Sequence, residues 1–360
     1  MMNRFVVLSG IVAGVLFAAS PSTYAVTNAT PIQIYGVWHA GNDACIWASV
    51  RNLTEFDHKN HWIIDRGDGI PSVNLVILSF VQPLKLLGKA NDSQTVNGLP
   101  AGMTPDIVNY FTSRGVRVML SIGGATYVKF WDQALAADAR QLGLNAAEVA
   151  QRLGVGIEID YEGDSATSLT GLQAFINAYR SVVPYDASGA NPAARLTIDL
   201  AAGDGWLISL AAKATRDWLS TTNPVLDYVN AMVADHQSSA SSAESNWQEH
   251  IKGTPRTTPP IPPLAPAKLT VSLSLTGRRV TTECTSFTRS VNYAARKYVQ
   301  TVAPNGAGTT PGMLGYMFWA AECPGTKTTC TTPPNTCEGG LGAGSKFFNI
   351  PIPMPALRQQ

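Results

Sequence analysis

The hydrophobic positions of this chain fall into two kinds of segment that alternate. Short apolar runs rich in β-branched residues and bounded by Gly, Pro or Asn recur eight times and indicate buried β-strands. These runs are residues 32–38, 73–81, 116–122, 155–161, 196–200, 228–233, 269–275 and 313–319. Between most of them the apolar residues repeat with a helical period, at residues 104–113, 128–153, 169–182, 206–219 and 287–302.

Repeated strand–helix units predict parallel strands joined by crossover helices. Eight such units favour an α/β fold, a (β/α)8 TIM barrel in a single domain over residues 26–360. The helices after the first and eighth strands are poorly marked. An open doubly wound sheet is the alternative, but no G-x-G-x-x-G follows the first strand and no phosphate-binding loop occurs. We interpret the Ser-rich residues 238–245 and the Pro-rich residues 254–266 as loops between the sixth and seventh strands.

The fourth strand carries acidic residues at alternate positions, namely Glu158, Asp160 and Glu162. Successive side chains of a strand point to opposite faces, so the three carboxylates are expected on one face, with neighbouring Cα atoms about 6.6 Å apart. Like-charge repulsion at that spacing raises at least one pKa, and a carboxyl that stays protonated can act as a general acid. A solvent-facing edge strand is the alternative. A central barrel strand, however, is buried on both faces, where unpaired charges are costly, so we interpret the row as catalytic.

Composition narrows the classes of function. The 360 residues are 45% hydrophobic and 14% charged, with a net charge of +1. This balance lacks the excess of positive charge that is typical of nucleic-acid-binding proteins. Residues 1–25 combine Arg4, an apolar run at residues 5–19 and small residues before a cut after Ala25, the pattern of a secretory signal peptide. A membrane anchor would need about 20 apolar residues. We therefore expect a secreted protein, extracellular or periplasmic, with no membrane attachment once the signal is removed.

Export makes disulfides possible, because the compartment is oxidising. The five cysteines are Cys45, Cys284, Cys323, Cys330 and Cys337. Cys330 and Cys337 share a Thr/Pro-rich loop and are expected to pair, Cys284 and Cys323 can join neighbouring loops, and one thiol is left over, but sequence alone does not fix the connectivity. The cysteines form no C-x-x-C and the five histidines are scattered, so no metal site is predicted.

Polar residues stand at the C-terminal ends of the predicted strands, where barrel enzymes place their active sites. The third strand gives S-I-G-G at residues 121–124, the sixth M-V-A-D at residues 232–235, and the eighth ends at Trp319. With the fourth strand, these motifs resemble the glycoside hydrolase family 18 chitinases, which carry S-x-G-G, D-G-x-D-x-D-x-E, M-x-Y-D and a closing tryptophan in this order. Taken alone, the two glycines could form only a tight turn. The resemblance extends from Tyr35 to Trp319.

The resemblance implies roles residue by residue. Glu162 matches the general acid, and Asp160 matches the aspartate that orients the acetamido group of the sugar and stabilises the charged intermediate. Glu158 stands where the family has an aspartate and can share a proton with Asp160. The residues matched to substrate contacts are Tyr35, Phe80, Gly123, Gly124, Met232, Asp235, His236 and Trp319.

Two positions depart from the family pattern. Val155 replaces an aspartate at the start of the fourth-strand motif, and Ala234 replaces a tyrosine that binds the acetamido carbonyl, for which His236 is a candidate substitute. The resemblance implies a secreted glycosidase that hydrolyses the β-1,4 linkages of chitin or N-acetylglucosamine oligomers by substrate-assisted, retaining catalysis. It implies no metal or organic cofactor and a monomer. Because no long insertion follows the seventh strand before its helix, we expect an open groove and endo cleavage.

Two other functions remain open. An endo-β-N-acetylglucosaminidase acting on N-glycan cores would share the fourth-strand motif. A lectin-like barrel would bind sugar without cleaving it. The presence of Glu162 argues against the lectin, whereas Ala234 keeps it open.

Overall fold

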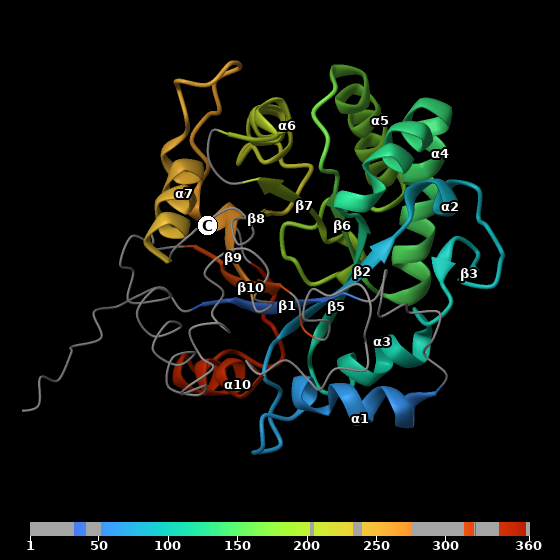
Figure 1. The fold of residues 1–360 in the computed structure, drawn as a ribbon, viewed down its shortest axis with the longest axis vertical. Helices are drawn as coiled ribbons and strands as arrows, with labels where there is room; N and C mark the ends of the chain where they lie inside the picture. Colours follow the sequence, from blue (N-terminus) through green and yellow to red (C-terminus); the bar gives the residue numbers. More distant parts are fainter. Residues whose placement is uncertain are drawn as a thin grey trace, which may run out of the picture.

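Eight parallel strands close into a barrel (Figure 1). They are β1 (Ile34–Ala40), β2 (Leu75–Val81), β5 (Arg117–Gly123), β6 (Gly156–Asp160), β7 (Leu196–Ala201), β8 (Val229–Met232), β9 (Leu269–Ser274) and β10 (Gly315–Trp319). Each predicted strand is present, with ends displaced by at most two residues. The predicted (β/α)8 TIM barrel is therefore confirmed.

The structure is a computed structural model that describes residues 32–40, 52–201, 205–232, 240–274, 313–319, 321 and 338–357. The expected signal peptide, all five cysteines and the predicted helix at residues 287–302 lie outside these residues.

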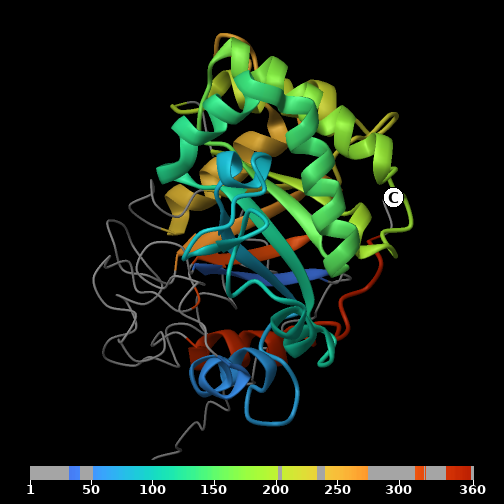
Figure 2. The same cartoon turned by 90° about the vertical axis from the view of Figure 1, so that its right-hand side faces the viewer.

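Helices surround the barrel, with α4 and α5 on one side of it and α1 and α10 on the other (Figure 2). The described helices are α1 (Leu53–Ile64), α2 (Pro83–Leu87), α3 (Pro105–Thr112), α4 (Val128–Leu153), α5 (Ala166–Val182), α6 (Ile208–Lys213), α7 (Ala240–Lys252) and α10 (Glu338–Phe347). The predicted helices at residues 104–113, 128–153 and 169–182 are confirmed as α3, α4 and α5. The segment predicted at residues 206–219 forms α6 and then a wider π-helical turn at Ala214–Trp218.

The interpretation of residues 238–245 as a loop is wrong, because α7 begins at Ala240. Serine is a poor helix former since its hydroxyl competes for backbone hydrogen bonds, and this hid the helix. Tertiary packing overrides that preference: Trp247 and His250 are buried at positions three apart on α7. The Pro-rich residues 254–266 are irregular, as predicted, apart from an isolated bridge between Thr254 and Ile261.

Other elements lacked a sequence signal. The short hairpin of β3 (Thr95–Val96) and β4 (Leu99–Pro100) was not predicted, nor were α1, α2 and α10. Helix α10 contains four glycines, each of which weakens a helix by about 1 kcal/mol relative to alanine. It is supported by the barrel, because Leu341 is buried in the outer core.

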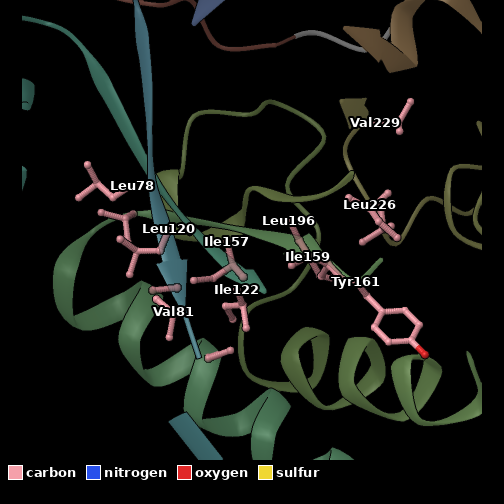
Figure 3. Close-up of a cluster of buried hydrophobic side chains, with 14 of the residues drawn as sticks. Leu78, Val81, Leu120, Ile122, Ile157, Ile159, Tyr161, Leu196, Leu226 and Val229 are labelled. Carbon is pink, nitrogen blue, oxygen red and sulfur yellow. The ribbon is translucent and has the colours of Figure 1, made fainter. Parts of the chain in front are cut away.

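Alternate side chains of the strands enter two different cores. Those on the outer face pack against the helices, and Figure 3 shows part of this cluster, including Leu120, Ile157 and Ile159. Those on the inner face form a second, smaller cluster inside the barrel, made of Ile34, Trp38, Leu75, Ile77, Met119, Tyr228, Leu314, Met317, Met354 and Leu357. Ile34, Leu75, Ile77 and Met119 lie in the first half of a strand, and Tyr228 and Leu314 stand immediately before one, so the barrel interior is apolar near the N-terminal strand ends.

The inner positions nearer the C-terminal strand ends are polar. Ser79, Ser121, Glu158, Asp199 and Asn230 are all buried there. Such groups are costly to bury unless they are hydrogen-bonded or neutral. The barrel thus encloses a polar layer above its apolar plug, at the end where TIM-barrel enzymes carry their active sites.

The packing of α4 on α5 gives a first testable prediction. A Cβ at Gly143 would lie 2.3 Å from the carbonyl oxygen of Phe175 and 2.9 Å from the Cβ of Ala178. Gly143→Ala should therefore destabilise the protein by about 1–3 kcal/mol in urea unfolding, although alanine is the better helix former. Gly205→Ala is the matched control, because a Cβ there meets nothing within 4 Å. Equal stabilities of the two variants would contradict the close helix contact.

Candidate active site

Glu158 is the most deeply buried of the three predicted carboxylates and lies inside the barrel on β6. The indole N–H of Trp38, on β1, donates to its Oε1 at 2.9 Å, and the side-chain amide of Asn230, on β8, donates to its Oε2 at 2.5 Å. The hydroxyl of Thr270 on β9 donates to the amide oxygen of Asn230, which turns the amide N–H groups toward Glu158. Burial raises the pKa of Glu158, and its hydrogen-bond donors oppose that rise.

Asp160 stands two residues further along the inner face of β6 and is 3% exposed. Within the described residues its Oδ1 has no hydrogen-bond partner. Burial raises its pKa well above the ordinary value, and the negative charges of Glu162 and Glu158 raise it further. Asp160 is therefore poised to hold a proton or to bind a polar group brought by a ligand.

Glu162 follows the end of β6 and is partly buried. Its segment is anchored on both sides. The hydroxyl of Tyr161 donates to Asp132 of α4 at 2.8 Å, and the carboxylate of Asp164 accepts two backbone N–H bonds in the first turn of α6, at 3.1 and 2.6 Å. The charge of Glu162 acts on Asp160, so the structure brings the predicted row of three carboxylates together.

A fourth carboxylate, which the sequence analysis missed, belongs to the same cluster. Asp199 on β7 is 1% exposed. The strands pair Ile159 with Ile198, so Asp160 and Asp199 come next in register on adjacent strands. Burial raises the pKa of Asp199 well above the ordinary value, and the negative charges of Glu158 and Asp160 raise it further. The signal was present in the sequence as an acidic residue within a predicted buried strand.

An aromatic wall stands beside these carboxylates. Phe80 stacks on Trp319 at a centroid distance of 5.6 Å, and Trp319 meets Trp38 edge-on at 6.3 Å. The register between β2 and β5 shifts between Ser79 and Val81, and such an irregularity re-aims the side chain within it, here Phe80. Two of these aromatic residues, Phe80 and Trp319, were predicted as substrate contacts, whereas the role of Trp38 was not.

Gly123 and Gly124 shape the site through their small size. Both have a positive φ, +123° and +93°. A Cβ at Gly123 would lie 1.8 Å from the backbone oxygen of Asp160, and one at Gly124 would lie 3.1 Å from the ring of Phe80. The glycines thus allow β5 to approach β6, and Phe80 to approach the turn. The two glycines form a strand-to-loop turn, and this turn lies against Asp160 and Phe80 of the candidate site.

The structure does not bring every predicted contact to the site. Tyr35 belongs to the outer core, where its hydroxyl donates to the backbone oxygen of Leu341 at 3.1 Å and its ring packs on Phe318. Its placement in the substrate pocket is therefore wrong, because the side chains of β1 alternate and Trp38 is the one that faces inward. Met232 ends β8 and is partly buried, whereas Asp235 and His236 lie outside the described residues.

The described residues form neither a metal-binding cluster nor a membrane-spanning helix. No group of three or more His, Cys, Asp or Glu side chains there is arranged to hold a metal ion. Among the helices of the described part of the chain, none is long and apolar enough to cross a membrane.

Several solved structures that are similar to this fold are glycosidases. A chitinase from Rhizomucor miehei is 13% identical, with a TM-score of 0.52, covering 86% of this chain and 99% of that chain. A family 18 N-acetylglucosaminidase from Paenibacillus barengoltzii is 11% identical, with a TM-score of 0.51 and the same coverages of 86% and 99%.

An endo-β-N-acetylglucosaminidase from Cordyceps militaris is 16% identical, with a TM-score of 0.50, covering 87% of this chain and 90% of that chain. No protein-family model and no curated protein matches the sequence. At these identities the likeness shows a shared fold, and the predicted resemblance to family 18 is confirmed at that level.

The bond from Trp38 to Glu158 gives a second testable prediction. Trp38→Phe keeps an aromatic ring but removes the N–H, so Oε1 of Glu158 loses its donor. A hydrogen bond to a charged group contributes about 1.5–3 kcal/mol, and the free energy of unfolding should fall by that amount in urea titrations. Trp62→Phe on α1 is the matched control, because the buried indole N–H of Trp62 has no partner within the described residues. A similar loss in both variants would show that the bond to Glu158 contributes little.

Proposed function

We propose that this protein is a secreted glycosidase that hydrolyses the β-1,4 linkages of chitin or N-acetylglucosamine oligomers. The observation that carries the proposal is the row of three carboxylates, with Glu158 and Asp160 on the inner face of β6 and Glu162 just beyond its end, beside an aromatic wall. Sugar rings have apolar faces that pack on aromatic side chains, and Phe80 and Trp319 provide such a surface. The expected signal peptide supports secretion.

Glu162 is proposed as the general acid. It is the member of the row nearest the open end of the barrel, and its backbone is anchored through Tyr161 and Asp164. A fixed position matters because an acid must lie within hydrogen-bond reach of the oxygen it protonates. Glu162 donates its proton to the glycosidic oxygen and then takes a proton from the water that completes hydrolysis.

The nucleophile is proposed to come from the substrate. Within the described residues, the acidic side chains clustered inside this end of the barrel are Glu158, Asp160 and Asp199 on the adjacent strands β6 and β7 and Glu162 just beyond β6. They approach a bound sugar from one side, whereas an acid and a protein nucleophile must flank the scissile bond. The 2-acetamido oxygen of the sugar attacks instead, and Asp160 orients that group and balances the positive charge of the cyclic intermediate.

A second candidate is an endo-β-N-acetylglucosaminidase acting on N-glycan cores. The likeness to the Cordyceps militaris enzyme, whose chain is covered to 90%, supports this second candidate. Both candidates cleave next to an N-acetylglucosamine and use the same carboxylates. Incubation with N-acetylglucosamine oligomers and, separately, with a high-mannose glycoprotein, followed by sizing of the products, distinguishes the two and also tests endo action.

The role of Glu162 gives a third prediction. Glu162→Gln should keep the fold and lose turnover by at least about 10²–10⁴, the usual contribution of a positioned general acid. The rate is measured on N-acetylglucosamine oligomers, with thermal unfolding as the check of the fold. Glu148→Gln on α4 is the matched control, since Glu148 is exposed and pairs with Lys89, and it should keep the wild-type rate. If Glu162→Gln retained more than about a tenth of the rate, another residue would be the acid.

The substrate-assisted mechanism gives a fourth prediction. Cellotetraose, which has a hydroxyl in place of the acetamido group, should not be cleaved, and a thiazoline analogue of the cyclic intermediate should inhibit. Both effects are measured by product analysis with N-acetylglucosamine tetramer as the positive control. Hydrolysis of cellotetraose, or indifference to the thiazoline, would exclude the mechanism and require a protein nucleophile.

A further inference from the structure

Asp199 lies in the buried carboxylate layer but has no role in the mechanism proposed above. Its side chain is enclosed inside the barrel and its Oδ1 has no hydrogen-bond partner within the described residues. It neighbours Asp160, which the mechanism uses, and Glu158, which stands two residues earlier on the same face of β6. Asp199 follows Ile198 in the register with Ile159, which places it beside Asp160, so Asp199 and Glu158 are neighbouring carboxyl groups of one buried layer.

A hydrogen bond between two carboxyl groups requires that one of them carry the proton, because two ionised carboxylates have only acceptors. The donors around the pair decide which one. Glu158 accepts from Trp38 at one oxygen and from Asn230 at the other, and both bonds favour its ionised form. Within the described residues, Asp199 accepts from no such donor. The proton therefore belongs on Asp199.

We propose that Asp199 is a positioning residue that stays protonated and donates its hydrogen bond to Glu158, leaving Asp160 free for the acetamido group of the substrate. The second half of this statement rests on the proposed function. Without the donor on β7, the charge of Glu158 would be less well satisfied and would hold the proton of Asp160 more firmly. Asp160 would then be slower to turn to the substrate.

The charged surroundings agree with a neutral Asp199. The described groups whose charges act on it are Glu158 and Asp160 on β6 and Glu162 beyond that strand, and all of them are acidic. The buried cations Arg195 and Lys268 and the partly buried Arg117 stand at the opposite end of the barrel, where β7, β9 and β5 begin. Burial and these neighbouring charges together raise the pKa of Asp199 well above its ordinary value.

The proton on Asp199 can be tested without any substrate. An unfolded aspartate loses its proton near pH 3.9, whereas native Asp199 keeps it to higher pH. The native state therefore binds more protons than the unfolded state above about pH 4, and wild-type stability falls as pH rises through the native pKa. The asparagine of Asp199→Asn is always neutral, so the stability of this variant does not fall for that reason as pH rises.

The expected result is that the melting temperature of Asp199→Asn, measured relative to wild type, rises between pH 4 and pH 8 by at least about 1.5 °C, the shift that about 1 kcal/mol produces in a chain of this size. Asp106→Asn on α3 makes the same charge change at an exposed site and should show no such trend. A relative melting temperature for Asp199→Asn that falls with pH, or does not change, would overturn the protonated assignment.

The positioning role is tested by kinetics on N-acetylglucosamine tetramer. Asparagine can still donate to Glu158, whereas alanine cannot. Asp199→Ala should therefore have a kcat at least about tenfold below that of Asp199→Asn, the effect of one lost donor to a charged group, with KM values within about twofold. Equal kcat values would overturn the positioning role. If the wild type cleaves neither oligomers nor glycoprotein, the proposed function fails together with the positioning role, while the melting measurements still decide where the proton lies.

Discussion

The rest of the site depends on one constraint, which is that the closed barrel buries carboxylates where water cannot solvate them. An ionised carboxylate in such a place is stable only if donors surround it, and otherwise it keeps its proton. Glu158 meets the first condition through Trp38 and Asn230, which reach it from β1 and β8. Asp160 and Asp199 have fewer partners within the described residues and follow the second.

The two ends of the barrel satisfy this constraint in opposite ways. Near the N-terminal strand ends, the buried Arg195 and the partly buried Arg180 face the carboxylate of Asp227, with the Arg180 nitrogen 3.2 Å from a carboxylate oxygen. An apolar plug that includes Met354 and Leu357 fills the interior at that end. The acidic layer is therefore separated from the cations by apolar side chains, and it retains the raised pKa values that acid–base chemistry requires.

At the open end of the barrel, hydrogen bonds to neighbouring helices hold Glu162 in position. Glu162 lies beyond the end of β6, where backbone is usually more mobile. The bond from Tyr161 to Asp132 and the bonds from the first turn of α6 to Asp164 fix the segment at two points. Their elements, α4 and α6, precede and follow β6 in the chain, so the anchors connect the acid to the helix layer as well as to the barrel.

Sequence by itself determined the parts of this protein that depend on local pattern. The eight strands, helices α3 to α5 and the row Glu158, Asp160 and Glu162 follow from hydrophobic period and from alternation along one strand. Helices α7 and α10 escaped prediction because serine and glycine are poor helix formers, and packing on the barrel overrides that preference.

Tertiary structure alone decided which residues meet across strands. Local alternation places Tyr35 and Trp38 on opposite faces of β1, but only closure of the barrel shows that the tryptophan faces Glu158 and the tyrosine faces the helices. Asp199 becomes part of the site because the register of β6 on β7 sets it beside Asp160. Register between strands distant in sequence is a property of the closed barrel, since it depends on how all eight strands fit together.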